Sequence, residues 1–286
     1  MHVRMVDAAV LVSVMAGCAA EHPTCADPAL EQRAGAVEPL VIGEWFTIDS
    51  RVLGEVRRVN VFVPTVYGEK IGAPMPVLYM PDGGLDEDFL HVAGLVQVLV
   101  SNGSMRPFVL VGIPNTQRRR DLTGPTSNLE DRKVAPVVGG SATFRRFIKE
   151  ELMPAVKARY RTTDETAIVG ESLAGLFVVE TMVVEPELFQ TYIAIDPSLW
   201  WNDGGILKDA AARAGRGRSG AKPTVFLTNS GDERVEGQAS RLAAVLQARG
   251  DVVVKYMPLE GAKHATIYHQ AALVAFGTVL APESKK

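Results

Sequence analysis

The pattern of apolar and polar residues predicts a series of short strands. Residues 44–50 and 55–63 are the first two, and the second alternates apolar and polar positions, as a strand with one covered face does. Gly54 and the turn before it predict that these two strands form a hairpin. From residue 76 onward the apolar runs are short and continuous, which is typical of parallel strands covered on both faces. These further strands are predicted at 76–80, 107–113, 166–169, 191–195, 223–228 and 252–257.

Stretches with helical spacing of apolar residues alternate with these strands. They predict helices at 89–100, 141–160, 235–249 and 268–280, and a further one that ends near residue 184. This alternation favours one α/β domain with a mostly parallel central sheet, an antiparallel N-terminal hairpin and helices on both faces. Sites in such sheets form in the loops after the carboxyl ends of the strands. The polar loop over 115–140 is long for a compact domain, and loops of that length are usually functional or mobile.

The N-terminus has the pattern of an export signal. A positively charged start precedes an apolar run over residues 8–16, which is too short to span a bilayer. The run ends at Met15-Ala16-Gly17-Cys18, which is similar to a bacterial lipoprotein cleavage box with Cys18 as the acylated residue. The alternative is ordinary cleavage near residues 18–20. Either cleavage predicts an exported protein, periplasmic or anchored to the membrane only through a lipid at Cys18.

Composition sets the domain organisation and excludes some partners. We predict a signal peptide at 1–17, a tether at 18–40, rich in Ala, Glu and Pro, and one α/β domain at 41–286. If Cys18 is acylated, the only other cysteine, Cys25, has no partner, so no structural disulfide is expected. The net charge is −3 with both signs mixed throughout, which argues against a nucleic-acid-binding face.

One segment has the form of a nucleophile elbow. Gly170-Glu171-Ser172-Leu173-Ala174-Gly175 lies between a predicted strand and a predicted helix. A serine on such a strained turn holds its hydroxyl clear of the backbone, and small flanking residues let the helix leave close to the strand. Ala174 stands where the usual pattern has glycine. The alternative is a chance turn of small residues.

A nucleophilic serine needs a base, and the base needs an acid to fix its tautomer. His264 lies in a glycine-containing loop after the last predicted strand, and Asp232 and Glu233 follow the strand at 223–228. The order serine, acid, histidine is typical of an α/β-hydrolase. The sequence does not separate Asp232 from Glu233 as the acid, and a structural histidine on a surface loop is the alternative for His264.

Acyl transfer also needs donors for the oxyanion. The amide of Leu173, directly after the serine, is one candidate, and the amides of Gly83 and Gly84 in the loop after the strand at 76–80 are the others. A plain turn is the alternative for the two glycines.

Four blocks of sequence carry a resemblance to a known family. Residues 77–84, 112–123, 170–175 and 196–201 are similar to signatures of the putative esterase family of α/β-hydrolases, which includes esterase D and the enterobactin-type siderophore esterases. The resemblance implies a serine hydrolase of carboxylic esters that needs no metal or other cofactor. It implies Ser172 as nucleophile and His264 as base. Some siderophore esterases are described as working with a Ser–His dyad, so the resemblance leaves the third member open.

The resemblance also implies which residues line the substrate cleft. Arg119 or Arg120 is the candidate to engage an acidic or catecholate substrate, and the alternative for the tryptophan pair is a buried first ring beside an exposed second one. A trilactone siderophore and an acetyl or feruloyl ester of a carbohydrate are both candidate substrates. An acyltransferase and a non-catalytic binding protein are the alternative functions. The residues implied to line the cleft are Asn115, Arg119, Arg120, Asp121, Trp200 and Trp201.

Overall fold

The computed structural model describes residues 38–66, 72–213, 221–232, 234 and 237–282. The chain divides into two units, residues 1–41 and 42–286, and every described helix and strand belongs to the second. The predicted signal peptide, Cys18 and most of the tether lie outside the described residues and stay predictions. None of the described helices combines the length and the apolar character needed to cross a membrane.

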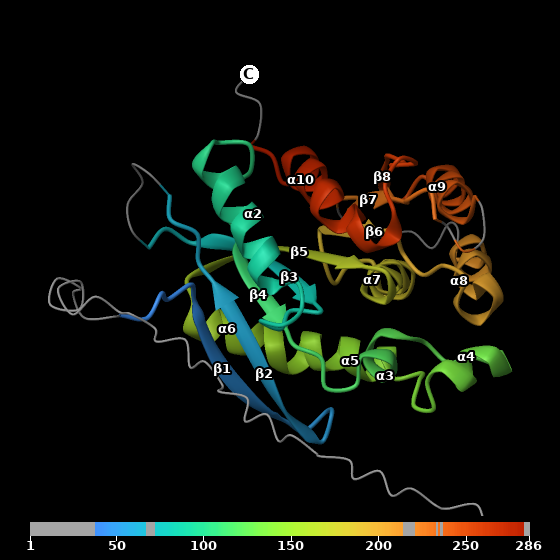
Figure 1. Ribbon diagram of the computed structural model, residues 1–286, viewed down its shortest axis with the longest axis horizontal. Coiled ribbons are helices and arrows are strands. Elements are labelled where there is room, and N and C mark those ends of the chain that lie inside the picture. The colour runs from blue at the N-terminus through green and yellow to red at the C-terminus, as the bar shows by residue number, and fades with distance from the viewer. Residues whose placement is uncertain (1–37, 67–71, 214–220, 233, 235–236, 283–286) are drawn as a thin grey trace, which may run out of the picture. The chain divides into compact units, whose positions relative to one another are not determined.

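The second unit is built on one eight-stranded sheet with the order β1-β2-β4-β3-β5-β6-β7-β8 (Figure 1). β1 pairs antiparallel with β2 and β2 antiparallel with β4, whereas all the remaining pairs are parallel. The predicted hairpin and mostly parallel sheet are therefore confirmed. The strands are β1 Glu44–Ser50, β2 Glu55–Phe62, β3 Met75–Pro81, β4 Val109–Ile113, β5 Thr162–Glu171, β6 Thr191–Ile195, β7 Thr224–Thr228 and β8 Val253–Tyr256.

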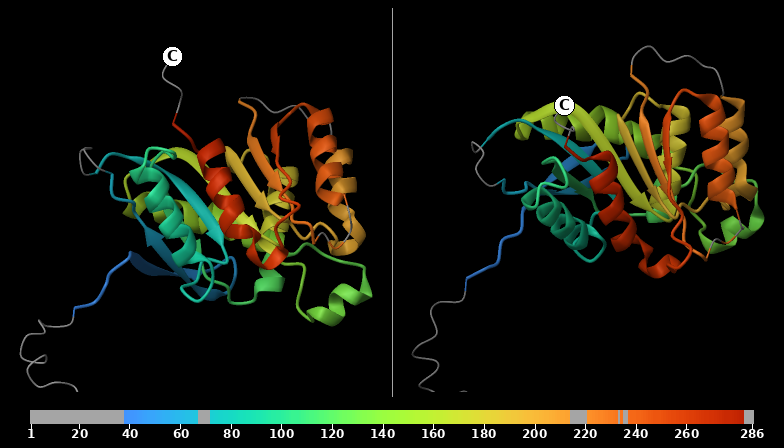
Figure 2. Two further views of the ribbon diagram at one scale, coloured as in Figure 1. Left: turned by 45° about the horizontal axis from the view of Figure 1, so that its top comes forward. Right: turned by 90° about the horizontal axis from the view of Figure 1, so that it is seen from above.

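Helices cover both faces of the sheet (Figure 2). α2 and α10 bury residues such as Leu95 and Phe276 against one face. The helices from α5 to α9 bury residues such as Phe147, Phe177 and Leu242 against the other. The helices of these two layers are α2 Phe89–Ser101, α5 Ser141–Phe147, α6 Met153–Arg159, α7 Leu173–Val184, α8 Trp201–Ala212, α9 Gln238–Arg249 and α10 Ile267–Val279.

The predicted helix over 141–160 is continuous but not uniform. Its middle, η1 Ile148–Leu152, is a π-helical turn between α5 and α6. Pro154 follows in the first turn of α6, and it has no N–H to donate to the preceding turn. The wider π turn accommodates that missing hydrogen bond within one long helix.

The long polar loop contains two short helices that the sequence pattern does not predict, α3 Arg118–Leu122 and α4 Leu129–Val134. Neither is long enough to carry a periodic apolar stripe. α8 was not predicted either, and a left-handed turn at Asn202, Asp203 and Gly204 interrupts its start. Tertiary contacts, not local periodicity, determine these segments.

The carboxyl ends of three central strands carry polar residues in a left-handed backbone conformation. Asp82 follows β3 with φ 56°, Ser172 follows β5 with φ 58°, and Asp196 follows β6 with φ 41°. Non-glycine residues adopt positive φ rarely, and such strain concentrates at functional sites. One edge of the sheet therefore collects the residues with candidate chemistry.

Candidate active site

Ser172 lies on a sharp turn between β5 and α7, as the elbow motif predicts. Close packing explains the small residues around it. A Cβ on Gly170 would approach the Cβ of Ala174 to 2.7 Å, and a Cβ on Gly175 would lie 3.0 Å from the carbonyl oxygen of Ile195. The alanine at the usual glycine position fits because Gly170 has no side chain opposite it.

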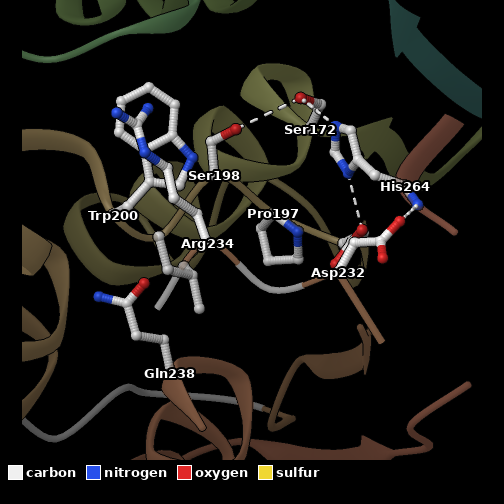
Figure 3. A pocket seen from close by; sticks show the side chains of 10 residues that line it. Ser172, Pro197, Ser198, Trp200, Asp232, Arg234, Gln238 and His264 are labelled. Carbon is white, nitrogen blue, oxygen red and sulfur yellow. Dashed lines mark hydrogen bonds and ion pairs between the residues drawn. The ribbon is translucent and has the colours of Figure 1, made fainter. Parts of the chain in front are cut away.

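The hydroxyl of Ser172 and the ring of His264 meet at this edge of the sheet (Figure 3). Ser172 Oγ lies 3.1 Å from His264 Nε2, and His264 Nδ1 lies 2.7 Å from Asp196 Oδ2. The side chain of Asp196 is 6% exposed, whereas that of His264 is 47% exposed. Serine, imidazole and buried carboxylate thus form one hydrogen-bonded chain, the arrangement that activates a serine hydroxyl.

The acid in this chain is not one of the two predicted residues. Asp232 accepts a hydrogen bond from the backbone N–H of His264 at 3.1 Å, so it supports the loop and does not contact the ring. Glu233 lies outside the described residues. β6 is hydrogen-bonded directly to β5, whereas β7 is one strand further away, so the end of β6 places Asp196 closer to the elbow. The order serine, acid, histidine is the same whether the acid follows β6 or β7, so chain order does not distinguish Asp196 from Asp232.

The electrostatics of the site follow from these contacts. Burial alone would raise the pKa of Asp196, but hydrogen bonds from His264 and Ser230 hold it below the usual value. The hydrogen bond to Asp196 raises the pKa of His264, and partial burial opposes that rise. A carboxylate that stays ionised beside the ring favours the tautomer with its proton on Nδ1, which leaves Nε2 free to accept the serine proton.

The structure differs from expectation at the oxyanion site. The N–H of Gly83 donates to the carbonyl of Ile113, the last residue of β4, at 3.1 Å, so this amide is already used in a backbone hydrogen bond. The N–H of Gly84 donates to the carboxylate of Glu87 at 2.7 Å. Leu173 begins α7, where the N–H groups have no acceptor within the helix. Of the three predicted donors, the Leu173 amide is therefore the one that lies beside the nucleophile and is not already used in a hydrogen bond to the sheet or to Glu87.

A cavity of about 260 Å³ opens beside Ser172 and His264. Trp200 lines it as predicted, and the guanidinium of Arg234 lies 4.1 Å from the centre of that ring (Figure 3). Ser198 Oγ is 3.3 Å from Ser172 Oγ. The rest of the lining consists of Asp196, Pro197, Leu199, Asp232 and Gln238.

Trp201, the second ring of the pair, is buried and donates from Nε1 to the carbonyl of Gly124 at 3.0 Å. The partly exposed ring is therefore the first, Trp200, the reverse of the alternative considered from sequence. Trp201 does not line the cavity beside Ser172; its hydrogen bond joins the long loop to the start of α8.

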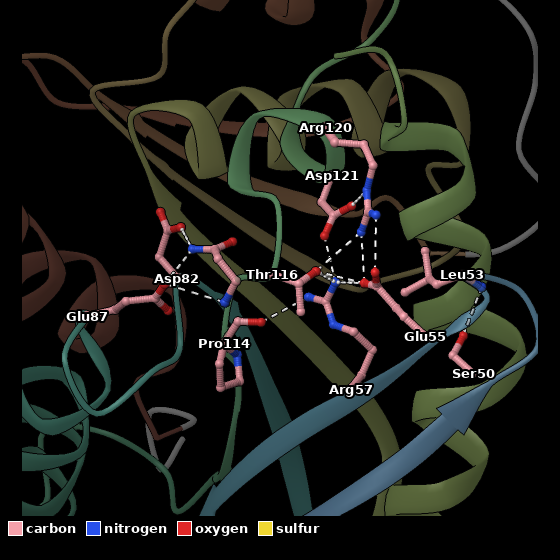
Figure 4. A network of polar contacts seen from close by, with 11 residues as sticks. Ser50, Leu53, Glu55, Arg57, Asp82, Glu87, Pro114, Thr116, Arg120 and Asp121 are labelled. Atoms are coloured by element: carbon pink, nitrogen blue, oxygen red, sulfur yellow. Dashed lines mark hydrogen bonds and ion pairs between the residues drawn. The ribbon is translucent and has the colours of Figure 1, made fainter. Parts of the chain in front are cut away.

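Arg120 and Asp121 belong to a buried ion-pair network and do not line the cavity beside Ser172 (Figure 4). The fully buried Arg57 donates to Asp121 at 2.6 Å, and Arg120 bonds both Asp121 and Glu55. Thr116 joins the same network. These contacts fasten the N-terminal hairpin to the loop after β4, and Arg120 also lines an open hollow separate from the cavity beside Ser172.

The other two loop residues also lie away from that cavity. Asn115 donates from its side-chain amide to Asp82 and Glu87, and it sits behind the loop that carries Gly84. Arg119 lines a separate, open hollow together with Pro136 and Val137.

Sequence reasoning missed several residues that line the cavity: Asp196, Ser198, Arg234 and Gln238. A signal existed for two of them. Asp196 and Ser198 follow the apolar run over 191–195 directly, at a strand end where sites are expected. Arg234 and Gln238 come from the loop after β7 and the start of α9, and no local pattern marks them.

Comparisons with known proteins show the family to which the chain belongs. Residues 50–265 match the putative esterase family. Ferri-bacillibactin esterase BesA of Bacillus subtilis is 31% identical over 239 residues, which cover 74% of this chain and 81% of that protein. Siderophore triacetylfusarinine C esterase of Aspergillus fumigatus is 32% identical over 194 residues, covering 61% of this chain and 62% of that protein.

Solved structures share the same architecture at lower identity. Siderophore hydrolase EstA from Aspergillus nidulans superposes with a TM-score of 0.75 at 20% identity, covering 87% of this chain and 100% of that one. An IroE-like serine hydrolase from Shewanella oneidensis superposes with a TM-score of 0.73 at 23% identity, covering 83% of this chain and 80% of that one. The chain therefore has the α/β-hydrolase fold and belongs to the putative esterase family.

Proposed function

We propose that this protein is a serine esterase that hydrolyses siderophore-type carboxylic esters through an acyl-enzyme. The observation that carries the proposal is the continuous hydrogen-bonded chain from Ser172 Oγ through His264 to Asp196 at the mouth of a cavity. The names of the relatives support the ester and siderophore class.

In the first half-reaction, Ser172 Oγ attacks the ester carbonyl carbon while His264 Nε2 takes its proton. Asp196 holds the ring in the required tautomer and stabilises the imidazolium that forms. The Leu173 amide, at the positive end of α7, stabilises the oxyanion of the tetrahedral intermediate. Collapse of this intermediate transfers the proton from Nε2 to the departing alcohol oxygen and leaves the acyl group on Ser172.

In the second half-reaction, His264 Nε2 takes a proton from water as the water oxygen attacks the acyl carbon. The imidazolium then returns the proton to Ser172 Oγ, and the carboxylic acid departs. Both halves use the same residues, so no additional acid or base is required.

The cavity supports binding of one arm of a larger ester. At about 260 Å³ it lies below the range of roughly 300–1,000 Å³ that encloses a whole drug-sized ligand. Its Trp200 ring offers a flat apolar face, and Arg234 adds a cation stacked on that ring. An aromatic arm that carries negative charge fits this pairing, while the rest of the ester extends into solvent.

A panel of esters tests the proposal. The purified protein is assayed with an intact catecholate trilactone, a feruloyl sugar ester and p-nitrophenyl acetate, with and without an acceptor alcohol, and the products are identified by mass spectrometry. We expect stepwise opening of the trilactone with water as acceptor. Preferred cleavage of the feruloyl ester, or ester products formed with the alcohol, would contradict the assignment.

A variant of Arg234 tests whether the cavity binds anionic substrates. Replacing Arg234 with alanine is expected to raise KM for anionic aryl esters about tenfold and to leave KM for neutral p-nitrophenyl acetate unchanged, because a hydrogen bond between charged groups contributes about 1.5 kcal/mol or more. Lys208, exposed on α8 and absent from the cavity lining, is the matched control. Equal effects of the two alanine variants would remove Arg234 from the substrate site.

Export and lipid attachment at Cys18 are part of the same proposal. They are supported by the apolar run and the Met15-Ala16-Gly17-Cys18 box alone. Incorporation of labelled palmitate that is lost in a Cys18→Ser variant is the expected result, and incorporation that persists in the variant would refute it.

A further inference from the structure

A second carboxyl group faces the same imidazole nitrogen as the nucleophile. Glu171 is the last residue of β5, directly before Ser172. Its Oε1 lies 3.4 Å from His264 Nε2, only 0.3 Å further than the 3.1 Å from that nitrogen to Ser172 Oγ. The Glu171 side chain is 16% exposed. The mechanism above gives this group no role.

The charged groups that act on Glu171 come from several elements of the fold. His264 and Arg118 favour the ionised form of its carboxyl, whereas Asp196 and Asp88 disfavour it. Arg118 is held in place by paired hydrogen bonds to Asp82. The phenol of Tyr268, fully buried on α10, is also within electrostatic range. Glu171 therefore sits between a fixed cation and the catalytic ring.

The geometry has opposite consequences for the two states of the ring. When His264 is neutral with its proton on Nδ1, Nε2 carries a lone pair, and an ionised carboxylate 3.4 Å away offers it no hydrogen bond. When His264 is an imidazolium, Nε2–H can donate to the serine oxygen, and the positive charge of the ring attracts the Glu171 carboxylate at ion-pair distance. An ionised Glu171 thus favours the protonated ring and a neutral Glu171 does not.

We propose that Glu171 is a positioning residue that acts through His264: its carboxylate forms an ion pair with the imidazolium, and it sets the acid limb of the activity profile. This inference rests on the proposed function. Burial raises the pKa of Glu171 to about 7, and the hydrogen bond to Asp196 and the charge of Glu171 raise the pKa of His264. Because the two groups lie 3.4 Å apart, the protonation of one changes the proton affinity of the other.

The charge of Glu171 determines the direction in which the acid limb of the pH profile moves. Catalysis requires neutral His264, so activity is lost as pH falls through the pKa of the ring. An ionised Glu171 raises that pKa, as the hydrogen bond to Asp196 does more strongly. Glu171→Gln keeps the size and polarity of the side chain but removes its charge. The pKa of His264 then falls, and the acid limb moves to lower pH.

The test is the pH profile of kcat/KM on p-nitrophenyl acetate for the wild type, Glu171→Gln and Glu260→Gln. Glu260 is exposed on the same loop as His264, so its variant makes the same change in net charge without a contact to the ring. We expect the limb of Glu171→Gln to move down by about one pH unit, in line with the effect of a nearby charge. The limb of Glu260→Gln should stay in place. Coincident limbs for all three proteins would overturn the proposal.

A second measurement does not depend on catalysis. The NMR titration of the His264 ring, assigned by its loss in a His264→Gln variant, is followed in the wild type and in Glu171→Gln. We expect a broad, two-step curve in the wild type and a single step at lower pH in the variant. A single step at the same pH in both proteins would refute the coupling, even if the esterase assignment holds. The expected curves with no esterase activity would refute only the proposed function.

Discussion

Exchange of Asp196 for asparagine separates the observed acid from the one expected by chain order. Asp196 Oδ1 accepts a hydrogen bond from the backbone N–H of Ser230 at 3.0 Å, and the asparagine carbonyl can keep that bond. Its NH₂ group then occupies the place of Oδ2, which lies 2.7 Å from His264 Nδ1. An N–H donor there favours the wrong tautomer, with the ring proton on Nε2. His264 can no longer accept the proton of Ser172.

The size of the effect follows from the loss of both tautomer and charge. Replacing the acid of a serine–histidine–aspartate system by its amide lowers kcat by on the order of 10⁴. At about 1.4 kcal/mol for each factor of ten, this is about 5.5 kcal/mol of transition-state stabilisation. Asp232→Asn keeps an oxygen that can accept the backbone N–H of His264 and removes only the charge of this exposed contact, so we expect a loss of at most about tenfold.

The assay is kcat on p-nitrophenyl acetate at a pH above the acid limb, with thermal unfolding of each variant as the control for folding. The reasoning predicts a folded, nearly inactive Asp196→Asn protein and an active Asp232→Asn protein. A reversed pattern, with Asp232→Asn nearly inactive and Asp196→Asn within tenfold of the wild type, would refute the assignment of the acid.

Two further predictions concern stability and are measured by urea unfolding. Gly83→Ala places a Cβ 2.2 Å from a backbone nitrogen of β4 and should lower the free energy of unfolding by about 3 kcal/mol or more. Gly94→Ala, in open space on α2, should leave it unchanged or raise it by up to about 1 kcal/mol. Equal urea midpoints for the two variants would contradict this. Arg57→Leu leaves the buried Asp121 without one of its cations and should cost about 3–5 kcal/mol, while Arg58→Leu on the exposed side of the same strand serves as control. A loss under 1 kcal/mol for Arg57→Leu would show that the network is not needed for stability.

The sequence predicted the sheet and the elbow well because each depends on a pattern of residues that are close together in the chain. Continuous apolar runs are compatible only with strands covered on both faces, and Gly170 and Gly175 occupy positions where a Cβ meets neighbouring atoms at close range. The long helix over 141–160 was found for the same reason, since its apolar stripe repeats over several turns. Segments of five or six residues, such as α3 and α4, carry no such repeat and were missed.

The candidate site was only partly predictable, because its assembly depends on which strands are neighbours. Ser172 and His264 were identified from their positions after strands, and the structure brings them together. Asp196 and Asp232 both follow strands and both precede His264, so chain order alone does not separate them, and the prediction named Asp232 and Glu233 but not Asp196. The pairing of β5 with β6, which selects Asp196, is a property of the folded sheet. The same holds for Arg120 and Asp121, which the family resemblance placed in the substrate cleft but which form ion pairs with each other and, through Asp121, with Arg57.

The most direct test of the central claim is to locate the residue that becomes acylated or phosphonylated. The protein is treated with a fluorophosphonate probe, digested and mapped by tandem mass spectrometry. Ser198 is the informative internal control, because its hydroxyl lies only 3.3 Å from that of Ser172. We predict a single adduct on Ser172 that disappears in a folded His264→Gln variant. An adduct on Ser198, or no adduct on a protein that hydrolyses esters, would contradict the account.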